Sequence, residues 1–358
     1  MKIVTIVGAR PQFIKAAPLS LKLKGFLEEV IVNTGQHYDY NMSDIFINEL
    51  KLPKPDYNLK VGSKSHAQQT AQMLIGIEEI LLKEKPNMVL VYGDTNSTLA
   101  GSLASAKLQI PVAHVESGLR SFNKAMPEEI NRILTDHTSS YLFCPTRESV
   151  RNLTSENITE NVFLVGDIMY DATLLYKDLA LQKSSVLEKL QLTNDKKNYY
   201  LLTIHRAENT DNPDRLFSIL NVLNKLDKKI IFPIHPRTMK MISHFNLNHL
   251  LKHKNIILID PVSYLDMLNL ESHAGLILTD SGGVQKEAYM LKVPCVTLRN
   301  ETEWVETTEN GWNEICGYDS DFIYEKINSF KTPNSYEYIF GDGNSAGKIV
   351  NILSNYKK

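Results

Sequence analysis

Two carboxylates follow directly on apolar runs of the chain, a placement that suits acid–base chemistry. Asp94 comes after Met88–Tyr92 and one glycine, and Glu116 comes after Pro111–Val115. If both runs are parallel strands, their carboxyl ends lie along one edge of a sheet and bring the two side chains together. Glu128 is a third candidate, although it opens a helix after a proline, where an acid also suits the helix dipole. We predict a cluster of carboxyl groups whose charges separate one another's pKa values.

Phosphate chemistry is indicated by Ser281, which precedes two glycines after the apolar run Gly275–Leu278. Serine is a favoured helix N-cap, and the glycines let a ligand approach the free N–H groups of a helix start, where phosphate binds. Glu287, one turn further on, could accept hydrogen bonds from ribose hydroxyls. The segment suggests a nucleoside diphosphate, although a plain capped helix would contain the same residues.

A similar turn follows the first apolar run, Lys2–Val7. Gly8 permits a tight turn, and Arg10 and Lys15 add positive charge at the start of the next helix, which makes a reasonable diphosphate cradle. The segment matches neither the dinucleotide pattern GxGxxG nor the P-loop pattern. A strand-to-helix turn with surface cations explains it equally well.

Histidines occur at the ends of further predicted strands. His205 lies beside an arginine at the end of Tyr199–Ile204 and could contact phosphate or act as an acid. His235 has a similar but weaker context, and Gln36 with His37 is weaker still. A structural role explains each of these residues as well as a functional one.

Composition excludes several classes of protein. The 39 basic and 41 acidic residues leave a net charge of −2, which predicts no nucleic-acid or membrane partner. The three cysteines form no CxxC pair, so we expect neither a zinc site nor a disulfide framework. The scarcity of cysteine predicts a cytoplasmic location. There is no HExxH or GxSxG motif, and an Asp94–Glu116 pair alone is a weak magnesium site, so we predict no metal. No apolar stretch approaches the ~18 residues of a membrane-spanning helix.

Short apolar runs alternate with amphipathic segments along the whole chain, which predicts a doubly wound α/β fold. Because the runs are apolar at successive positions, we expect parallel strands that are buried on both faces. The predicted domains are 1–170 and 171–344, with a helix at about 345–358 that packs back on the first domain. The expected strands are Lys2–Val7, Glu29–Asn33, Met88–Tyr92, Pro111–Val115, Tyr141–Cys144, Asn161–Val165, Tyr199–Ile204, Lys229–Ile234, Asn255–Ile259, Gly275–Leu278 and Cys295–Leu298. The expected helices between them include His66–Lys83, Ser97–Lys107, Glu128–Ser139, Pro213–Leu226 and Tyr264–Ser272.

These segments together resemble the non-hydrolysing UDP-N-acetylglucosamine 2-epimerases over nearly the whole chain. The resemblance implies the GT-B fold, with two Rossmann-like parallel-sheet domains and an active-site cleft between them. It implies an isomerase that interconverts UDP-GlcNAc and UDP-ManNAc by eliminating UDP to a 2-acetamidoglucal and adding it back, with no cofactor. It also implies a homodimer and a place in polysaccharide biosynthesis. The motifs that carry the resemblance are Gly8–Pro11, Gly35–His37, Gly93–Thr95, His114–Arg120, Pro127–Arg132, His205–Arg206, Asp280–Glu287 and Gly341–Gly343.

The resemblance also implies roles for individual residues. The positions that match its catalytic residues are Asp94, Glu116, Glu128 and His205. The positions that match its UDP contacts are Arg10, Lys15, Ser281, Gly282, Gly283 and Glu287. Gln36, His37 and His235 fall where some bacterial members hold a second, activating UDP-GlcNAc.

The chain departs from the usual motifs at four positions. Ala9 and Gln12 replace the Thr and Glu of Gly-Thr-Arg-Pro-Glu, and Trp304 and Val305 replace the Arg and Pro of Thr-Glu-Arg-Pro-Glu. These forms look more like the branch that acts on UDP-2,3-diacetamido-2,3-dideoxyglucuronate. Loss of the negative charge at Gln12 would suit an anionic sugar, whereas loss of the Arg argues against it. A GT-B glycosyltransferase, a hydrolysing epimerase and a non-catalytic nucleotide-sugar binder are three further functions that the same kind of nucleotide site could serve.

Overall fold

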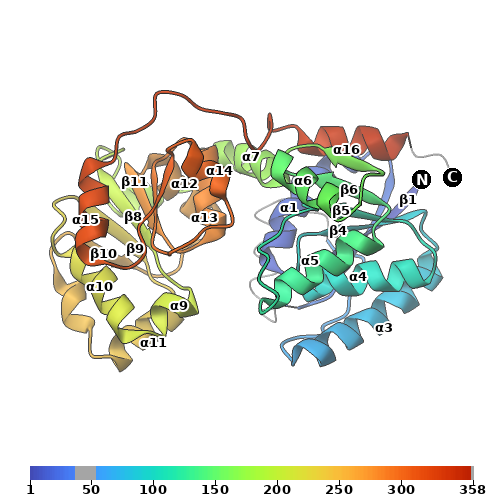
Figure 1. The fold of residues 1–358 in the computed structure, drawn as a ribbon, viewed down its shortest axis with the longest axis horizontal. Helices are drawn as coiled ribbons and strands as arrows, with labels where there is room; N and C mark the ends of the chain where they lie inside the picture. The colour runs from blue at the N-terminus through green and yellow to red at the C-terminus, as the bar shows by residue number, and fades with distance from the viewer. Residues whose placement is uncertain (37–53, 356–358) are drawn as a thin grey trace. The chain divides into compact units, whose positions relative to one another are not determined.

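The chain is described by a computed structural model that covers residues 1–36 and 54–355. It divides into two compact units, each with its own sheet (Figure 1). Unit 1 consists of Met1–Leu175 with Tyr338–Lys358, and unit 2 consists of Tyr176–Glu337. The C-terminal segment therefore belongs to the same unit as the N-terminus.

Unit 1 contains a seven-stranded parallel sheet in the order β3-β2-β1-β4-β5-β6-β7. The strand order reverses between β1 and β4, which pair in parallel with Ile3 opposite Met88. The carboxyl ends of strands at such a switch point are where open α/β sheets bind ligands. The strands are β1 Lys2–Val7, β2 Glu28–Asn33, β3 Tyr57–Asn58, β4 Met88–Tyr92, β5 Val112–Val115, β6 Tyr141–Cys144 and β7 Val162–Leu164.

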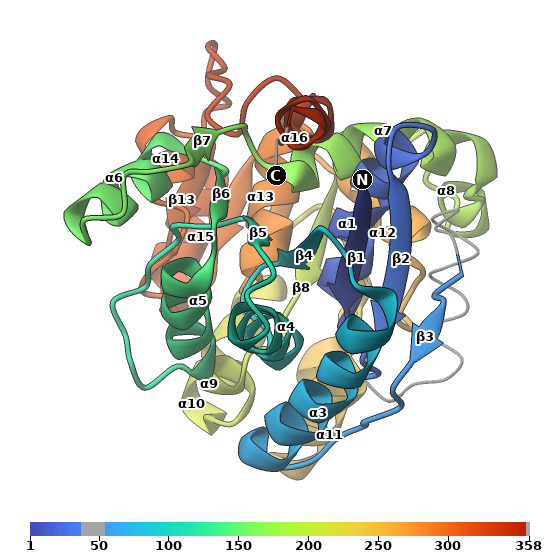
Figure 2. The same ribbon diagram turned by 90° about the vertical axis from the view of Figure 1, so that its right-hand side faces the viewer.

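The helices of unit 1 follow its strands and cover the sheet. Helices α3, α4 and α5 pack side by side in that order, while α1 packs against the C-terminal helix α16 (Figures 1 and 2). The helices are α1 Arg10–Leu23, α3 His66–Glu84, α4 Asn96–Lys107, α5 Pro127–Thr138, α6 Arg147–Ser155, α7 Ile168–Lys183, which continues into unit 2, and α16 Ser345–Ser354.

Unit 2 contains a six-stranded parallel sheet in the order β10-β9-β8-β11-β12-β13. Its switch point lies between β8 and β11, where Thr203 pairs with Thr279. The strands are β8 Tyr199–Thr203, β9 Lys229–Pro233, β10 Ile256–Ile259, β11 Leu276–Thr279, β12 Cys295–Thr297 and β13 Asn313–Ile315. The helices are α8 Val186–Lys189, α9 Ala207–Thr210, α10 Pro213–Leu223, α11 Pro236–His244, η1 Asn248–Lys252 (a 3₁₀ helix), α12 Tyr264–His273, α13 Gly282–Met290, α14 Val305–Glu309 and α15 Ser320–Ser329.

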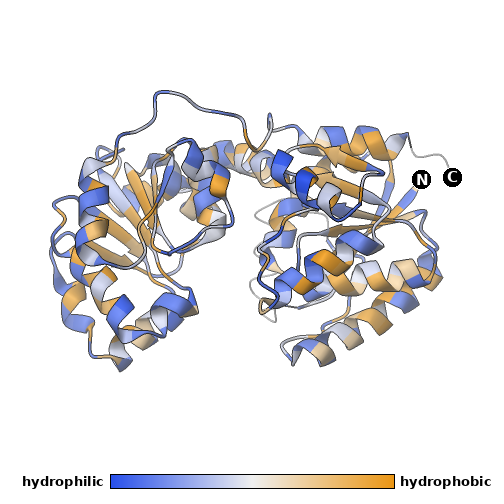
Figure 3. Ribbon diagram, in the orientation of Figure 1, coloured by the Kyte–Doolittle hydropathy of each residue, from blue (hydrophilic) through white to orange (hydrophobic). Residues whose placement is uncertain are grey.

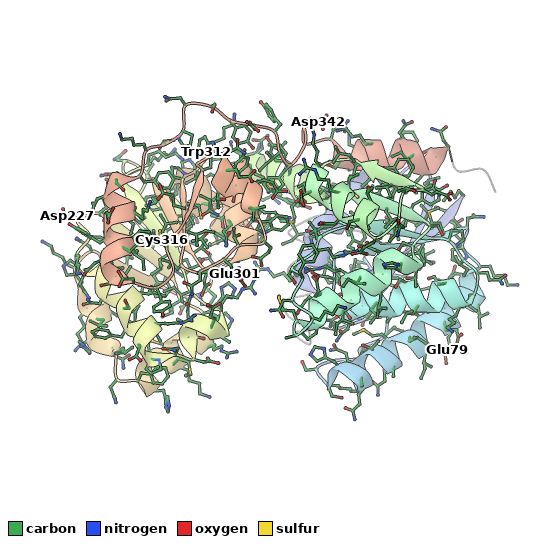
Figure 4. All side chains as sticks on the ribbon, viewed as in Figure 1. Glu79, Asp227, Glu301, Trp312, Cys316 and Asp342 are labelled. Carbon is green, nitrogen blue, oxygen red and sulfur yellow. The ribbon has the colours of Figure 1, made fainter. Side chains whose placement is uncertain are left out.

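Apolar side chains fill both faces of each sheet, because helices cover the central strands on both sides. All residues of β4 and β8 are buried, and the strands are the most apolar elements of the ribbon (Figure 3). In unit 2 the buried residues Trp312 and Cys316 come from the end of the sheet at β13 (Figure 4). The predicted fold class, doubly wound α/β with two parallel sheets, is confirmed. Within the described ranges, no helix is both long and apolar enough to cross a membrane.

Candidate active site

Glu116 and Lys15 form an ion pair at the carboxyl edge of the unit 1 sheet. Glu116 directly follows β5, and its Oε2 accepts a hydrogen bond from the Nζ of Lys15, which lies on α1. The side chains of Lys15 and Glu116 are only 12% and 7% exposed. Glu116 has φ +71°, a left-handed conformation that is strained for a residue with a Cβ. The turn after β5 therefore directs the Glu116 carboxylate toward α1, and the left-handed backbone of Glu116 costs conformational energy.

Asp94 follows β4 and contacts Arg132 of α5. The Nη2 of Arg132 donates to Asp94 Oδ2, and its Nη1 donates to Glu129 Oε2 at 2.8 Å. The amide of Asn131, the preceding residue of α5, donates to the backbone oxygen of Asp94 at 3.0 Å. Helix α5 thus fixes both the backbone and the side chain of Asp94, which is 33% exposed.

Adjacent acids on α5 occupy opposite environments. Glu128 is exposed, whereas Glu129 is buried and accepts hydrogen bonds from the Ser121 backbone N–H and hydroxyl and from the Phe122 N–H, each at 2.9 Å. Burial alone would raise the pKa of Glu129, but the hydrogen bonds from Ser121 and Phe122 and the charge of Arg132 outweigh it and lower the pKa. Glu129 is therefore an ionised anchor for the loop before α5.

A buried ionic network lies behind these carboxylates. The Nδ1 of His114 lies 2.7 Å from Asp136 Oδ1, and its Nε2 lies 2.7 Å from the carbonyl oxygen of Gly93. Because a carbonyl oxygen can only accept, Nε2 donates to Gly93, and Nδ1 shares a hydrogen bond with the Asp136 carboxyl group. The second oxygen of Asp136 accepts from Gly118 N at 3.0 Å and from Arg120 Nη1 at 2.7 Å. Burial alone would raise the pKa of Asp136, but the contacts with His114 and Arg120 lower it. The network ties the turn that carries Asp94 to the loop after Glu116.

Gln12 organises the turn after β1 rather than facing a ligand. Its Oε1 accepts from Gly8 N at 2.9 Å and Ala9 N at 3.0 Å, and its Nε2 donates to the Tyr92 carbonyl and the Thr98 hydroxyl, both at 2.9 Å. The residue is completely buried. The polar atoms of Gln12 are therefore used within the chain, and the preference for an anionic sugar that its missing negative charge suggests stays a prediction.

The remaining residues of the unit 1 motifs have separate positions. Arg10 begins α1 and is half-buried. Gln36 follows β2, and its Oε1 accepts from the backbone N–H of Ser97 at 3.0 Å and from the Ser97 hydroxyl at 2.7 Å, so that it joins β2 to α4. His37 lies outside the described residues.

At the switch point of unit 2, Asp280 joins the strand ends of β8 and β11. Its carboxylate is fully buried and accepts from the backbone N–H groups of His205 at 3.1 Å and Arg206 at 3.0 Å. The His205 side chain is 42% exposed, with its Nδ1 3.6 Å from Asp280 and its ring centroid 6.4 Å from that of His235. Burial lowers the pKa of His205; Asp280 opposes this shift, and Arg206 and His235 reinforce it. This environment therefore favours the neutral form of His205. His235 itself is exposed and caps α11, with Nδ1 accepting from Arg237 N at 3.2 Å.

Helix α13 begins next to Asp280, with Ser281 as its N-cap. A Cβ at Gly282 would lie 3.2 Å from Glu303 Oε1 and 3.3 Å from Trp304 Nε1, so only glycine fits without displacing them. A Cβ at Gly283 would meet only the hydroxyl oxygen of Ser281, at an ordinary 3.8 Å. The Glu303 carboxylate lies 2.7 Å from Arg299 Nη1 and 3.6 Å from Arg206 Nη2. A carboxylate paired with two arginines thus lies beside the helix start, whose N–H groups favour anions.

The interior of α13 carries two charged side chains, Lys286 and Glu287, and of these only Glu287 was a predicted site residue. Lys286 is buried, and its Nζ lies 4.2 Å from the ring centroid of Trp304. The position where the usual motif has an arginine therefore holds an aromatic ring that packs against a lysine. Glu287 is also buried, and it interacts electrostatically with Glu271 of α12.

The structure brings the sequence-predicted residues into two groups, one in each unit. In unit 1, Arg132 interacts with Asp94, Glu129 and Glu116. In unit 2, His205 lies near both His235 and Asp280, and Asp280 directly precedes Ser281. Asp136 was missed, and the pairing of Arg132 with Asp94 and Glu129 was not predicted although Glu129 and Arg132 stand in the Pro127–Arg132 motif. A histidine inside the buried strand Val112–Val115 requires a buried hydrogen-bond partner, and this requirement could have predicted a residue such as Asp136. In residues 1–36 and 54–355, no three His, Cys, Asp or Glu residues form a group that could hold a metal ion.

Two doubly wound parallel sheets with polar clusters at their switch points define a protein of GT-B-like fold. The family model "UDP-N-acetylglucosamine 2-epimerase" matches residues 20–354. This chain belongs to the UDP-N-acetylglucosamine 2-epimerase family.

Relatives align along their whole length with this chain. A Methanococcus maripaludis protein named UDP-N-acetylglucosamine 2-epimerase homolog is 56% identical, over 99% of this chain and 100% of the relative. A Pseudomonas aeruginosa protein named UDP-2,3-diacetamido-2,3-dideoxy-D-glucuronate 2-epimerase is 46% identical, over 99% of both chains. The crystal structure of Methanocaldococcus jannaschii UDP-GlcNAc 2-epimerase in complex with UDP-GlcNAc and UDP is 48% identical, covers 99% of this chain and 100% of its own, and has a TM-score of 0.89.

Proposed function

We propose that this chain is a non-hydrolysing 2-epimerase that interconverts UDP-GlcNAc and UDP-ManNAc. A base removes the proton at carbon 2 while the bond from carbon 1 to the UDP oxygen breaks, and its electron pair leaves with UDP. The resulting 2-acetamidoglucal has a double bond between carbons 1 and 2. UDP then adds back to carbon 1 as a proton reaches the opposite face of carbon 2. The cycle is redox-neutral and consumes no water.

The observation that carries this proposal is the pair of cation-bound carboxylates at adjacent strand ends. Glu116 contacts Lys15, and Asp94 contacts Arg132. Partly buried carboxylates held in this way can exchange the proton at carbon 2 and stabilise positive charge that develops at carbon 1. Exposed Glu128 and neutral His205 are proposed as further acid–base groups.

We assign the nucleotide to the residues that the motifs suggest. The N–H groups at the start of α13, with Ser281 as its N-cap, suit the diphosphate, and Glu287 suits the ribose. Arg10 is proposed to contact UDP from unit 1. Lys15, also expected to contact UDP, is bonded to Glu116, so we propose that it acts on the sugar side. The proposed assembly is a homodimer, and Gln36 and His235 are proposed to serve an activating UDP-GlcNAc.

A deuterium experiment tests the reaction type. The protein is incubated with UDP-GlcNAc in D₂O, and the products are followed by NMR and mass spectrometry. We expect deuterium at carbon 2 of both UDP-sugars, with the nucleotide still attached. Free ManNAc would instead indicate a hydrolysing epimerase, and no exchange without an acceptor would favour a glycosyltransferase or a binding protein.

A second candidate substrate is UDP-2,3-diacetamido-2,3-dideoxyglucuronate, handled by the same chemistry. The Pseudomonas relative named for this substrate and the Trp304 form of the Thr302–Glu306 segment both favour it. Buried Lys286 against Trp304 adds positive charge near α13, which suits an additional carboxylate on the substrate. Comparing kcat/KM for the two UDP-sugars distinguishes the candidates, since the true substrate should be preferred by about 10²-fold or more.

A further inference from the structure

The contacts of Arg132 connect the candidate acid–base group Asp94 to a buried, rigid anchor. We propose that Arg132 is the positioning residue of Asp94, which holds that carboxylate in the orientation needed at carbon 2. The inference rests on the proposed epimerase function and goes beyond it, because Arg132 acts through Asp94 rather than on the substrate. Its guanidinium is planar, so the nitrogen that holds Glu129 also fixes the direction of the nitrogen that reaches Asp94.

Glu129 is the fixed end of this connection. It is buried, and its carboxylate receives three hydrogen bonds at 2.9 Å from Ser121 and Phe122 in addition to the contact with Arg132. A carboxylate with this many donors has little freedom to rotate. Phe122 has φ +57°, so the loop adopts a costly conformation in order to reach Glu129. The loop therefore fixes Glu129, Glu129 orients Arg132, and Arg132 in turn orients the Asp94 carboxylate.

Asp94, by contrast, has few constraints of its own. Its side chain is 33% exposed, and Arg132 is the hydrogen-bond partner found for its carboxylate among the described residues. Glu116 is held by its own ion pair with Lys15, and its interaction with Arg132 is electrostatic. Without Arg132, Asp94 would lie near Glu129 with no cation between them, and the two carboxylates would repel each other. Loss of Arg132 should therefore disorder Asp94 selectively.

A double-mutant cycle tests this inference. We compare Arg132→Met, Asp94→Asn and the double variant, with kcat and KM for the UDP-sugar and circular dichroism as a control for folding. Arg132→Met is expected to lower kcat by about 10- to 100-fold, on the scale of a misplaced acid–base group, and to change KM by less than about threefold. The double variant should be no slower than Asp94→Asn, because the positioning that Arg132 supplies acts on kcat through the Asp94 carboxylate.

Rescue separates positioning from a general effect on folding. Methylguanidinium added to the Arg132→Ala variant should raise its kcat about tenfold, because it supplies the planar guanidinium group that the substitution removed. Arg132→Lys should recover less than wild-type turnover, since an ammonium group cannot hold both carboxylates with a fixed geometry. If Arg132→Met does not fold, Arg132→Lys takes its place in the cycle. Arg151→Met removes an exposed arginine that pairs with Glu148 at 2.8 Å, and it should leave kcat unchanged.

Several results would overturn the inference. Wild-type turnover in Arg132→Met would do so, and so would losses in kcat that multiply in the double variant, because these would show a role independent of Asp94. Wild-type turnover in Asp94→Asn would remove the residue through which Arg132 acts. Failure of the proposed function is distinguishable, because the wild-type protein would then incorporate no deuterium at carbon 2.

Discussion

At the scale of single residues, the two candidate acid–base carboxylates differ in how they are held. Glu116 is buried, strained and paired with Lys15, whereas Asp94 is partly exposed and depends on Arg132. A strained backbone at a strand end persists only where the surroundings enforce it, and such positions cluster at functional sites. Glu116 is therefore suited to proton transfer in a geometry that its own backbone fixes. For Asp94, the geometry of proton transfer depends on Arg132.

Neutral amides at these two positions should remove proton transfer while keeping the shape of each side chain. We expect Asp94→Asn and Glu116→Gln each to lower kcat by about 10²-fold or more, the scale of a lost acid–base group. Steady-state conversion of the UDP-sugar measures the effect. Glu79→Gln, at an exposed position of α3 (Figure 4), is the matched control and should keep full turnover. Near-normal turnover in both site variants would contradict the carboxylate mechanism.

The pKa of His205 gives a prediction that is independent of activity. Because burial, Arg206 and His235 lower it against the opposing effect of Asp280, NMR titration should place its midpoint below the ordinary 6.5. His235→Asn removes one lowering charge and should raise the midpoint, whereas His249→Asn, at an exposed site, should not. Since the pKa is lowered on folding, any contribution of His205 to stability is lost as pH falls below 6.5. A midpoint at or above that value would contradict this electrostatic environment.

The positions of Asp94, Glu116, His205 and Ser281 could be predicted from the sequence, because each follows closely on an apolar run. Their partners could not. Arg132 is 38 residues from Asp94 along the chain, and Glu129 is held by a loop contact that no local pattern encodes. Gln12 shows the same limit, since its residue type is compatible with a ligand contact and only the fold reveals its four internal hydrogen bonds.

At the scale of elements, the apolar strands were predicted well, including the edge strands β7 and β10, whereas two short edge strands were not. The expected runs Lys2–Val7, Met88–Tyr92 and Tyr141–Cys144 are observed with the same bounds. The edge strands β3 and β13 were missed because they are short and half polar, and their formation depends on pairing with β2 and β12. A periodicity argument detects strands that are buried on both faces, whereas an edge strand is specified by its neighbour.

The turn between β1 and α1 depends on one buried side chain. Gln12→Met keeps its volume but leaves the N–H groups of Gly8 and Ala9 without their acceptor, so we expect a loss of stability of about 2 kcal/mol or more. Urea unfolding followed by circular dichroism measures this loss. Gln72→Met, on the exposed side of α3, is the matched control and should change stability by less than about 0.5 kcal/mol. Equal stability of the two variants would show that the Gln12 hydrogen bonds do not hold the turn.

At the scale of the whole molecule, the two units have separate sheets and cores, and their unfolding can be observed separately. Both tryptophans of the chain, Trp304 and Trp312, are in unit 2, so tryptophan fluorescence reports on that unit alone. Circular dichroism reports on both. A substitution in the core of one unit should therefore change one transition and leave the second unchanged, if the units unfold independently.

Glu271 is a suitable residue for such a substitution, because it is a buried acid in the interior of unit 2. It is 1% exposed, and neither carboxyl oxygen has a hydrogen-bond partner among the described residues. Burial, with a further contribution from Glu287, raises its pKa well above the ordinary value. In the folded protein it therefore keeps a proton that the unfolded chain releases, so that its cost to stability grows as pH rises above 4.5.

Glu271→Met should consequently stabilise unit 2 by about 1–3 kcal/mol at pH 7, the usual cost of an unpaired buried polar group. The gain should be larger at pH 8 and smaller at pH 5, and it should appear in the fluorescence transition of unit 2. Glu325→Met, at an exposed position of α15, removes the same charge without relieving burial and should produce no such gain. A destabilised Glu271→Met protein, or a gain independent of pH, would mean that this carboxyl group has a partner in the folded protein.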